Sequence, residues 1–151
     1  MSDSVAARAS TWLPLLQEAL AQEGRFRWPL RGDSMWPTLP SACEIELAPL
    51  NAVTHLGELI VFVIDDTLIA HRLVRRMNGY WIAQGDNRLA PDRPVPPERV
   101  LGRVVAAYQN DRQCWPGRFF ALERIVWLAR YHILRVPRGL RHRWKRVMNR
   151  G

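Results

Sequence analysis

Residues 59–74 have the sequence LIVFVIDDTLIAHRLV, and this stretch decides the class of fold. It begins with an unbroken β-branched and aromatic run, Leu59–Ile64, which is typical of a strand buried on both faces. Asp65–Asp66 is a turn signal, and a second strand is expected over Leu68–Val74. The second apolar run is interrupted by a histidine, His71. The stretch therefore predicts two consecutive strands, the second of which carries a titratable side chain.

Short segments of the same kind continue on both sides of this stretch. Asn78–Gly79 is a strong hairpin signal. Residues 85–98 are rich in Pro, Asp and Asn and are expected to form a loop. Further strands are expected over Arg27–Leu30, Cys43–Leu47, Tyr80–Gln84 and Val100–Tyr108. Strands at such close spacing predict a mostly β fold, a coiled antiparallel sheet or partly open barrel.

Helical periodicity appears at the two ends of the chain. Residues 4–23 carry leucines at helical spacing and stop at Gly24. Residues 117–134 return to this spacing, and their apolar face is expected to consist of Phe120, Ile125, Trp127 and Leu128, with Arg124 and Arg130 elsewhere. The predicted organisation is an N-terminal helix (1–24), a β domain (25–110) and a basic helical tail (115–151).

The charge is concentrated at one end of the chain. The 151 residues carry a net charge of +8, and seven basic side chains without any acidic one lie in residues 135–151. The rest of the chain is nearly neutral, so an anion is expected to bind the tail. No signal peptide and no apolar run of membrane-spanning length is found, which predicts a cytoplasmic location. Cys43 and Cys114 form no motif and are expected to be reduced thiols, and no metal site is expected.

Three segments carry side chains that suit catalysis. Residues 32–39 (GDSMWPTL) place Ser34 in a turn after a strand, where its backbone N–H can bind an oxyanion. His71 can accept the proton of a serine hydroxyl near neutral pH. The loop after residue 84 supplies Asp86 and Asp92, and a carboxylate can orient an imidazole. Each segment alone also fits a plain structural role, such as an Asp that caps local N–H groups.

Taken together, the three segments resemble the conserved boxes of the type I signal peptidases, over about residues 26–108. The serine box of that family, Ser-Met-x-Pro-Thr, is similar to Ser34-Met35-Trp36-Pro37-Thr38. The other matching segments are Gly57-Glu58 before an apolar strand, His71-Arg72-Leu73-Val74 as the base box, and Gly85-Asp86-Asn87 with Asp92 as the final box.

The resemblance implies the branch that uses histidine as the base, as in endoplasmic-reticulum, archaeal and sporulation-type members. The sequence supports this independently, because the only lysine is Lys145 in the tail. The implied acid is Asp92, with Asp86 as the alternative acid or as support for the loop. Gly32 stands where members usually carry a serine, so the oxyanion site would consist mainly of the Ser34 backbone N–H. The Gly-Asp-Ser-Met form also resembles the related self-cleaving repressor domains, and the N-terminal membrane anchor of the family is not expected.

By this resemblance the chain is a serine endopeptidase that cleaves an extended precursor peptide or protein without a cofactor. The substrate would bind as an added β-strand with small side chains next to the cut, in contact with Met35, Ile69 and Ala70. The alternative is a non-enzymatic or self-cleaving regulatory or peptide-binding module with the same fold. Its own cut would then fall in the N-terminal segment.

The basic end of the chain has several interpretations. Aromatic residues interleaved with arginines over residues 117–150 predict contact with an anionic membrane surface, which would place the protein at the inner face of the membrane. A helix packed on the domain with a solvated tail fits equally well. Nucleic acid is disfavoured because no base-reading motif accompanies the charge. The oligomeric state is left open.

Overall fold

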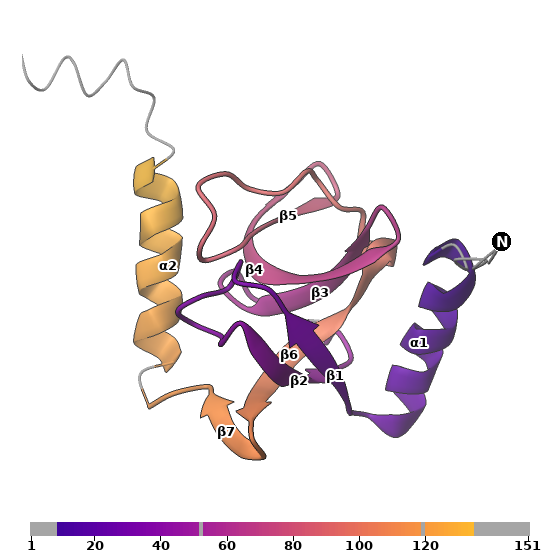
Figure 1. Ribbon diagram of the computed structural model, residues 1–151. Coiled ribbons are helices and arrows are strands. Elements are labelled where there is room, and N and C mark those ends of the chain that lie inside the picture. The colour runs from indigo at the N-terminus through magenta and orange to yellow at the C-terminus, as the bar shows by residue number, and fades with distance from the viewer. Residues whose placement is uncertain (1–8, 52, 119, 135–151) are drawn as a thin grey trace, which may run out of the picture.

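An antiparallel sheet of seven strands forms the body of the protein, with one helix at each end of the described chain (Figure 1). The computed structural model describes residues 9–51, 53–118 and 120–134. The elements in chain order are α1 (Ala9–Glu23), β1 (Phe26–Arg31), β2 (Ala42–Ala48), β3 (Leu59–Ile64), β4 (Thr67–Met77), β5 (Tyr80–Gln84), a 3-10 turn (Pro97–Arg99), β6 (Val100–Gln109), β7 (Arg112–Trp115) and α2 (Phe120–Leu134). The prediction of a mostly β chain is therefore confirmed.

Tight hairpins make three of the six connections between consecutive strands, β3–β4, β4–β5 and β6–β7. At Asp65–Asp66 and at Asn110–Asp111 both residues have left-handed φ angles, and so do Asn78 and Gly79. Short polar side chains and glycine tolerate this conformation, and its twist matches that of the flanking strands. The Asn110–Asp111 turn starts β7, a strand that the sequence prediction did not contain.

The sheet has the strand order β1-β2-β6-β3-β4-β5, with β7 also paired to β6, and it does not close into a barrel. Every residue of β3 except the last is buried, as the apolar run predicts. The pairing of β4 with β5 begins at Arg72, so Thr67–His71 pair with β3 alone. The outer edge of β1 is also unpaired. β1 and the first half of β4 are thus two unpaired edge segments of the sheet, besides the outer edge of β7 and, apart from one bridge to Val95, that of β5.

The two helices lie on opposite sides of the sheet (Figure 1). Leu13 and Leu20 of α1 are buried in the largest apolar cluster, together with side chains of β2 and β3. Gly102 of β6 lies so close to α1 that a Cβ atom there would be 2.7 Å from Leu20 Cδ2. α1 is thus an integral part of the core. The expected helix 4–23 is confirmed over α1, and the expected basic tail after residue 134 lies outside the described residues.

α2 packs on the domain at Gly57, just before β3. Gly57 has φ +89°, and a Cβ atom at this position would lie 2.1 Å from Arg124 Cγ and 3.3 Å from Leu128 Cδ1. Both the backbone conformation and the close approach of α2 therefore require glycine. This gives a physical reason for the Gly-Glu dipeptide that precedes the apolar strand.

Replacing this glycine should destabilise the protein through both effects. We expect Gly57→Ala to lower the free energy of unfolding by about 2–4 kcal/mol, from left-handed strain and overpacking against α2. Gly79→Ala is the matched control, because Gly79 has φ +79° but nothing within 4 Å of the added Cβ. The control should lose only about 1–2 kcal/mol from strain. Urea unfolding measures both, and equal losses would show that the contact with α2 is unimportant.

Candidate functional site

Ser34 lies in the turn that follows β1, as the sequence predicts, and is half-buried. Its carbonyl oxygen accepts a hydrogen bond of 2.8 Å from the Asn87 backbone N–H. The Asn87 side chain donates a second one to the Asp33 carbonyl, at 3.0 Å. The serine turn is therefore fastened to the loop after β5. Among the described residues, neither the hydroxyl nor the backbone N–H of Ser34 has a hydrogen-bond partner.

His71 projects from β4 and is only 6% exposed. Its Nδ1 atom lies 2.6 Å from Oδ2 of Asp92. The backbone N–H of Asp92 donates to the Ala83 carbonyl at 2.8 Å, which ties this part of the loop to β5. The ring packs edge-on against Phe62, with ring centroids 6.1 Å apart. The imidazole thus has a fixed orientation, with Nε2 on the side away from the carboxylate.

Gly85 is the point at which the serine and histidine segments meet. A Cβ atom added at Gly85 would lie 2.6 Å from the Ser34 carbonyl oxygen and 3.0 Å from Nε2 of His71. The distance between the Ser34 carbonyl oxygen and Nε2 of His71 is therefore no larger than the sum of these two distances. Any side chain at residue 85 would stand between the serine and the imidazole. The sequence shows Gly85 only as part of a motif, and this steric role needs the three-dimensional structure.

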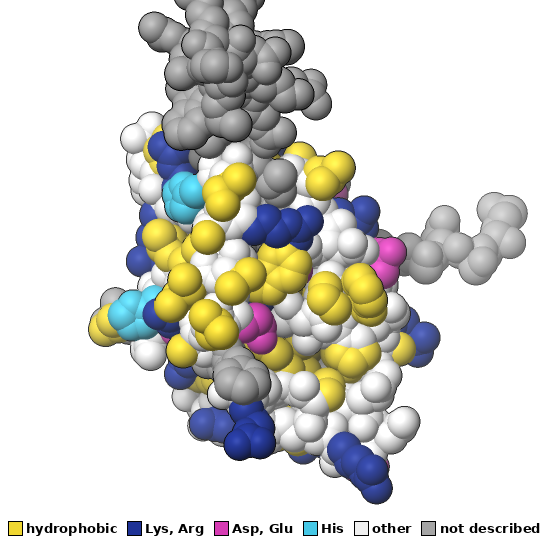
Figure 2. Space-filling view, turned by 90° about the vertical axis from the view of Figure 1, so that its left-hand side faces the viewer, with side chains coloured by type: hydrophobic (Ala, Val, Ile, Leu, Met, Phe, Trp, Pro, Cys, Tyr) yellow, Lys and Arg dark blue, Asp and Glu magenta, His cyan; other side chains and the backbone are white. Residues whose placement is uncertain are grey.

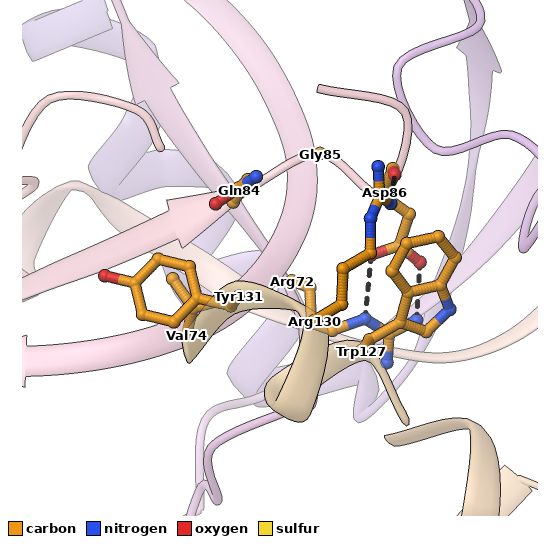
Figure 3. A pocket seen from close by; sticks show the side chains of 8 residues that line it. All are labelled: Arg72, Val74, Gln84, Gly85, Asp86, Trp127, Arg130 and Tyr131. Atoms are coloured by element: carbon orange, nitrogen blue, oxygen red, sulfur yellow. Dashed lines mark hydrogen bonds and ion pairs between the residues drawn. The ribbon is translucent and has the colours of Figure 1, made fainter. Parts of the chain in front are cut away.

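The two carboxylates of the loop have different partners. Asp86 accepts two hydrogen bonds from Arg72, from Nε at 2.9 Å and from Nη2 at 2.6 Å (Figure 3). It also accepts one from the Thr38 hydroxyl at 2.5 Å. Arg72 is 1% exposed and Asp86 is 4% exposed, so this ion pair is buried. The structure therefore brings Asp92 to the imidazole, whereas Asp86 supports the loop.

α2 contributes to the same buried cluster. Glu123 Oε1 lies 2.8 Å from Arg72 Nη2, and Arg130 donates a hydrogen bond to the Asp86 carbonyl. The indole of Trp127 lies beside both guanidinium groups (Figure 3). Burial alone would lower the pKa of Arg72, but its hydrogen bonds to Asp86 and Glu123 and its attraction to their charges raise the pKa above its ordinary value. Arg72 is therefore a permanent buried cation.

A pocket of about 230 Å³ lies between the two unpaired edge segments. Its walls come from β1 and β4, and Ile45 and Val61 lie at its base, both 1% exposed. The lining residues are Trp28, Pro29, Leu30, Arg31, Ile45, Val61, Leu68, Ile69 and Ala70. Of the residues expected to contact a substrate, Ile69 and Ala70 line this pocket, whereas Met35 is buried in the core.

In residues 9–51, 53–118 and 120–134 no group of three or more His, Cys, Asp or Glu side chains could hold a metal ion. No helix there is long and apolar enough to cross a membrane. Cys43 is buried and Cys114 is exposed, and both are free thiols. Burial, with a smaller effect of Cys114, raises the pKa of the Cys43 thiol to about 11, so Cys43 is an unreactive core residue.

Comparisons with known proteins do not assign the chain to a family. No family model matches the sequence, and no curated protein matches it. The resemblance to the type I signal peptidases therefore depends on the short boxes quoted above. The function has to be inferred from the geometry of the side chains.

The different surroundings of the two aspartates predict different effects on stability. Asp86→Asn should lower the free energy of unfolding by about 3 kcal/mol, because it leaves the buried Arg72 without its main counter-charge. Asp92→Asn should lower it by only about 1 kcal/mol, because Asp92 is half-buried and the amide can still accept a hydrogen bond. Urea unfolding of both variants measures the difference. A larger loss for Asp92→Asn would contradict the assigned roles.

Proposed function

We propose that this chain is a serine endopeptidase with the fold and chemistry of the signal-peptidase superfamily, in which histidine is the base. The observation that carries the proposal is the orientation of His71. Asp92 binds Nδ1, and Nε2 lies beside Gly85 and the Ser34 segment. A carboxylate on Nδ1 keeps the proton there and leaves Nε2 free to accept another, as a general base requires.

The substrate would bind in an extended conformation between β1 and the first half of β4. Both segments have an unpaired edge, and unpaired edges bind peptides as added strands. A peptide there would fill the opening of the sheet and pass over the pocket above Ile45 and Val61. This pocket is too small for several large side chains, which supports a preference for small residues next to the cut.

In the first step, the Ser34 Oγ attacks the carbonyl carbon of the substrate and its proton passes to Nε2 of His71. The backbone N–H of Ser34 has no hydrogen-bond partner among the described residues and so is available to the oxyanion. Asp92 stabilises the imidazolium that forms. The hydroxyl makes no hydrogen bond in the free protein, and such catalytic contacts commonly shorten when the substrate binds.

In the second step, the C–N bond of the tetrahedral intermediate breaks and the leaving amine takes the proton from His71. The acyl-enzyme remains on Ser34. A water molecule then attacks this ester while His71 accepts a proton from the water. The ester C–O bond breaks, His71 returns the proton to the Ser34 Oγ, and the acid product leaves. No metal or cofactor takes part in any of these steps.

The direct test is cleavage by variants of the nucleophile and the base. Ser34→Ala and His71→Ala should each lower the rate of peptide cleavage at least about a thousandfold, because the two groups act as a unit. The control is Ser41→Ala, an exposed serine a few residues further on. Mass spectrometry of a peptide library incubated with the purified proteins detects the cuts. The same spectra show whether wild-type protein cuts its own chain, as a self-cleaving module would.

Full activity of Ser34→Ala would disprove the proposal. Peptide binding without cleavage by the wild-type protein would favour the peptide-binding module instead. In either case circular dichroism must show that the variants are folded, so that loss of activity is not loss of structure.

Gly85→Ala tests the geometry rather than the identity of the catalytic groups. The added methyl group would push apart the Ser34 carbonyl and the imidazole, and a misplacement of about 1 Å lowers the rate by roughly a hundredfold. Gly117→Ala is the control, because nothing lies within 4 Å of the added Cβ. Peptide cleavage kinetics measure both variants. Unchanged kcat/KM in a folded Gly85→Ala protein would mean that serine and histidine do not meet at this residue.

A further inference from the structure

The charged side chains of α2 lie on the side that faces the domain, which is unusual for a surface helix. Glu123, Arg124 and Arg130 bind or pack against the Arg72–Asp86 pair and Gly57 there. The same side also carries Trp127, Leu128 and the buried Tyr131. The side that faces solvent carries no charged residue. We call it the outer face of α2, and it consists of Ala121, Leu122, Ile125, Val126, Ala129, His132 and Ile133, all of them exposed.

The large side chains of this face are well exposed. The exposed fractions are 57% for Leu122, 61% for Ile125, 54% for Val126 and 63% for Ile133. Their spacing forms one continuous row on the helix. Figure 2 looks onto the side of the molecule that carries α2 and shows hydrophobic side chains gathered there. A contiguous apolar surface of this kind marks an interaction site.

Two further apolar side chains are exposed in the loop before Gly57, on which α2 packs. Val53 is 58% exposed and Leu56 is 40% exposed.

The charge of the chain indicates what covers this face. Residues 135–151 follow α2 directly and hold seven basic and no acidic side chains. An apolar helix face next to such a basic segment matches a membrane surface with anionic headgroups, where acyl chains accept the apolar residues and the headgroups attract arginine and lysine. A second copy of the chain carries the same net charge of +8 and so offers no complementary charge to this basic segment.

We propose that the outer face of α2 lies in the plane of an anionic membrane, with Leu122, Ile125, Val126 and Ile133 buried at the boundary between headgroups and acyl chains. The seven basic residues that follow α2 in the sequence supply the positive charge that attracts the headgroups. Glu123 and Arg130, on the side of α2 that faces the domain, remain bound to Arg72 and Asp86. The loop that carries Gly85 and Asp92 therefore lies on the side of α2 away from the membrane. Membrane binding does not depend on catalysis.

The test uses the full chain and vesicles made of equal parts phosphatidylcholine and phosphatidylglycerol, with pure phosphatidylcholine for comparison. We expect co-sedimentation with the anionic vesicles only, weakened by high salt because salt screens the charges. Ile125→Ser and Val126→Ser should each lower the partition coefficient about tenfold, because each removes an apolar side chain from the bilayer. The matched control is Leu15→Ser on α1, where Leu15 is 63% exposed on the opposite side of the molecule.

Three outcomes would overturn the proposal: no binding to anionic vesicles, equal binding to pure phosphatidylcholine, or equal loss in the Leu15→Ser control. A dimer in analytical ultracentrifugation that Ile125→Ser dissociates, without vesicle binding, would assign the outer face to a second copy and also overturn it. Ser34→Ala should bind vesicles as the wild-type protein does. A failure of membrane binding and a failure of the peptidase proposal are therefore distinguishable.

Discussion

The buried ion pair between Arg72 and Asp86 holds together the parts of the protein that carry the candidate site. Arg72 belongs to β4, Asp86 to the loop after β5, Thr38 to the serine turn and Glu123 to α2, and all four side chains are joined by hydrogen bonds. Both charges of the pair are withdrawn from water, so neither can lose its partner without a large cost in stability. The relative position of these four segments is therefore fixed by one electrostatic constraint.

This constraint acts on the candidate catalytic groups through the residues next to them in the sequence. His71 precedes Arg72, and successive side chains of a strand point to opposite faces. When Arg72 is held by Asp86 on one face, the imidazole is presented on the other. Gly85 precedes Asp86 and comes to lie between His71 and Ser34 for the same reason. The ion pair thus aligns the site without contacting a substrate.

The strands and hairpins that carry these residues could be predicted from the sequence. Apolar runs and turn dipeptides predict β3, β4, β5 and the hairpins because period and turn chemistry are properties of adjacent residues. The partners of Arg72 are 14 and 51 residues away, and no local pattern connects them. The predicted apolar face of α2 was wrong in part for the same reason. Trp127 and Leu128 do lie toward the domain, but Ile125 is exposed. Arg130, which was expected elsewhere, lies toward the domain and binds the Asp86 carbonyl.

The side of α2 that faces the domain carries its charged residues beside the buried Tyr131, and this orientation leaves the apolar row on the other side. Glu123 and Arg130 can reach the ion pair only if the apolar row on the opposite side remains in water. An exposed row of this size carries an unfavourable free energy that a bilayer would remove. One orientation of α2 therefore has two consequences: its charged residues hold the loop after β5, and its apolar row is available to a membrane. A variant in which the apolar row faced the domain would lose both the contacts with the loop and the exposed apolar row.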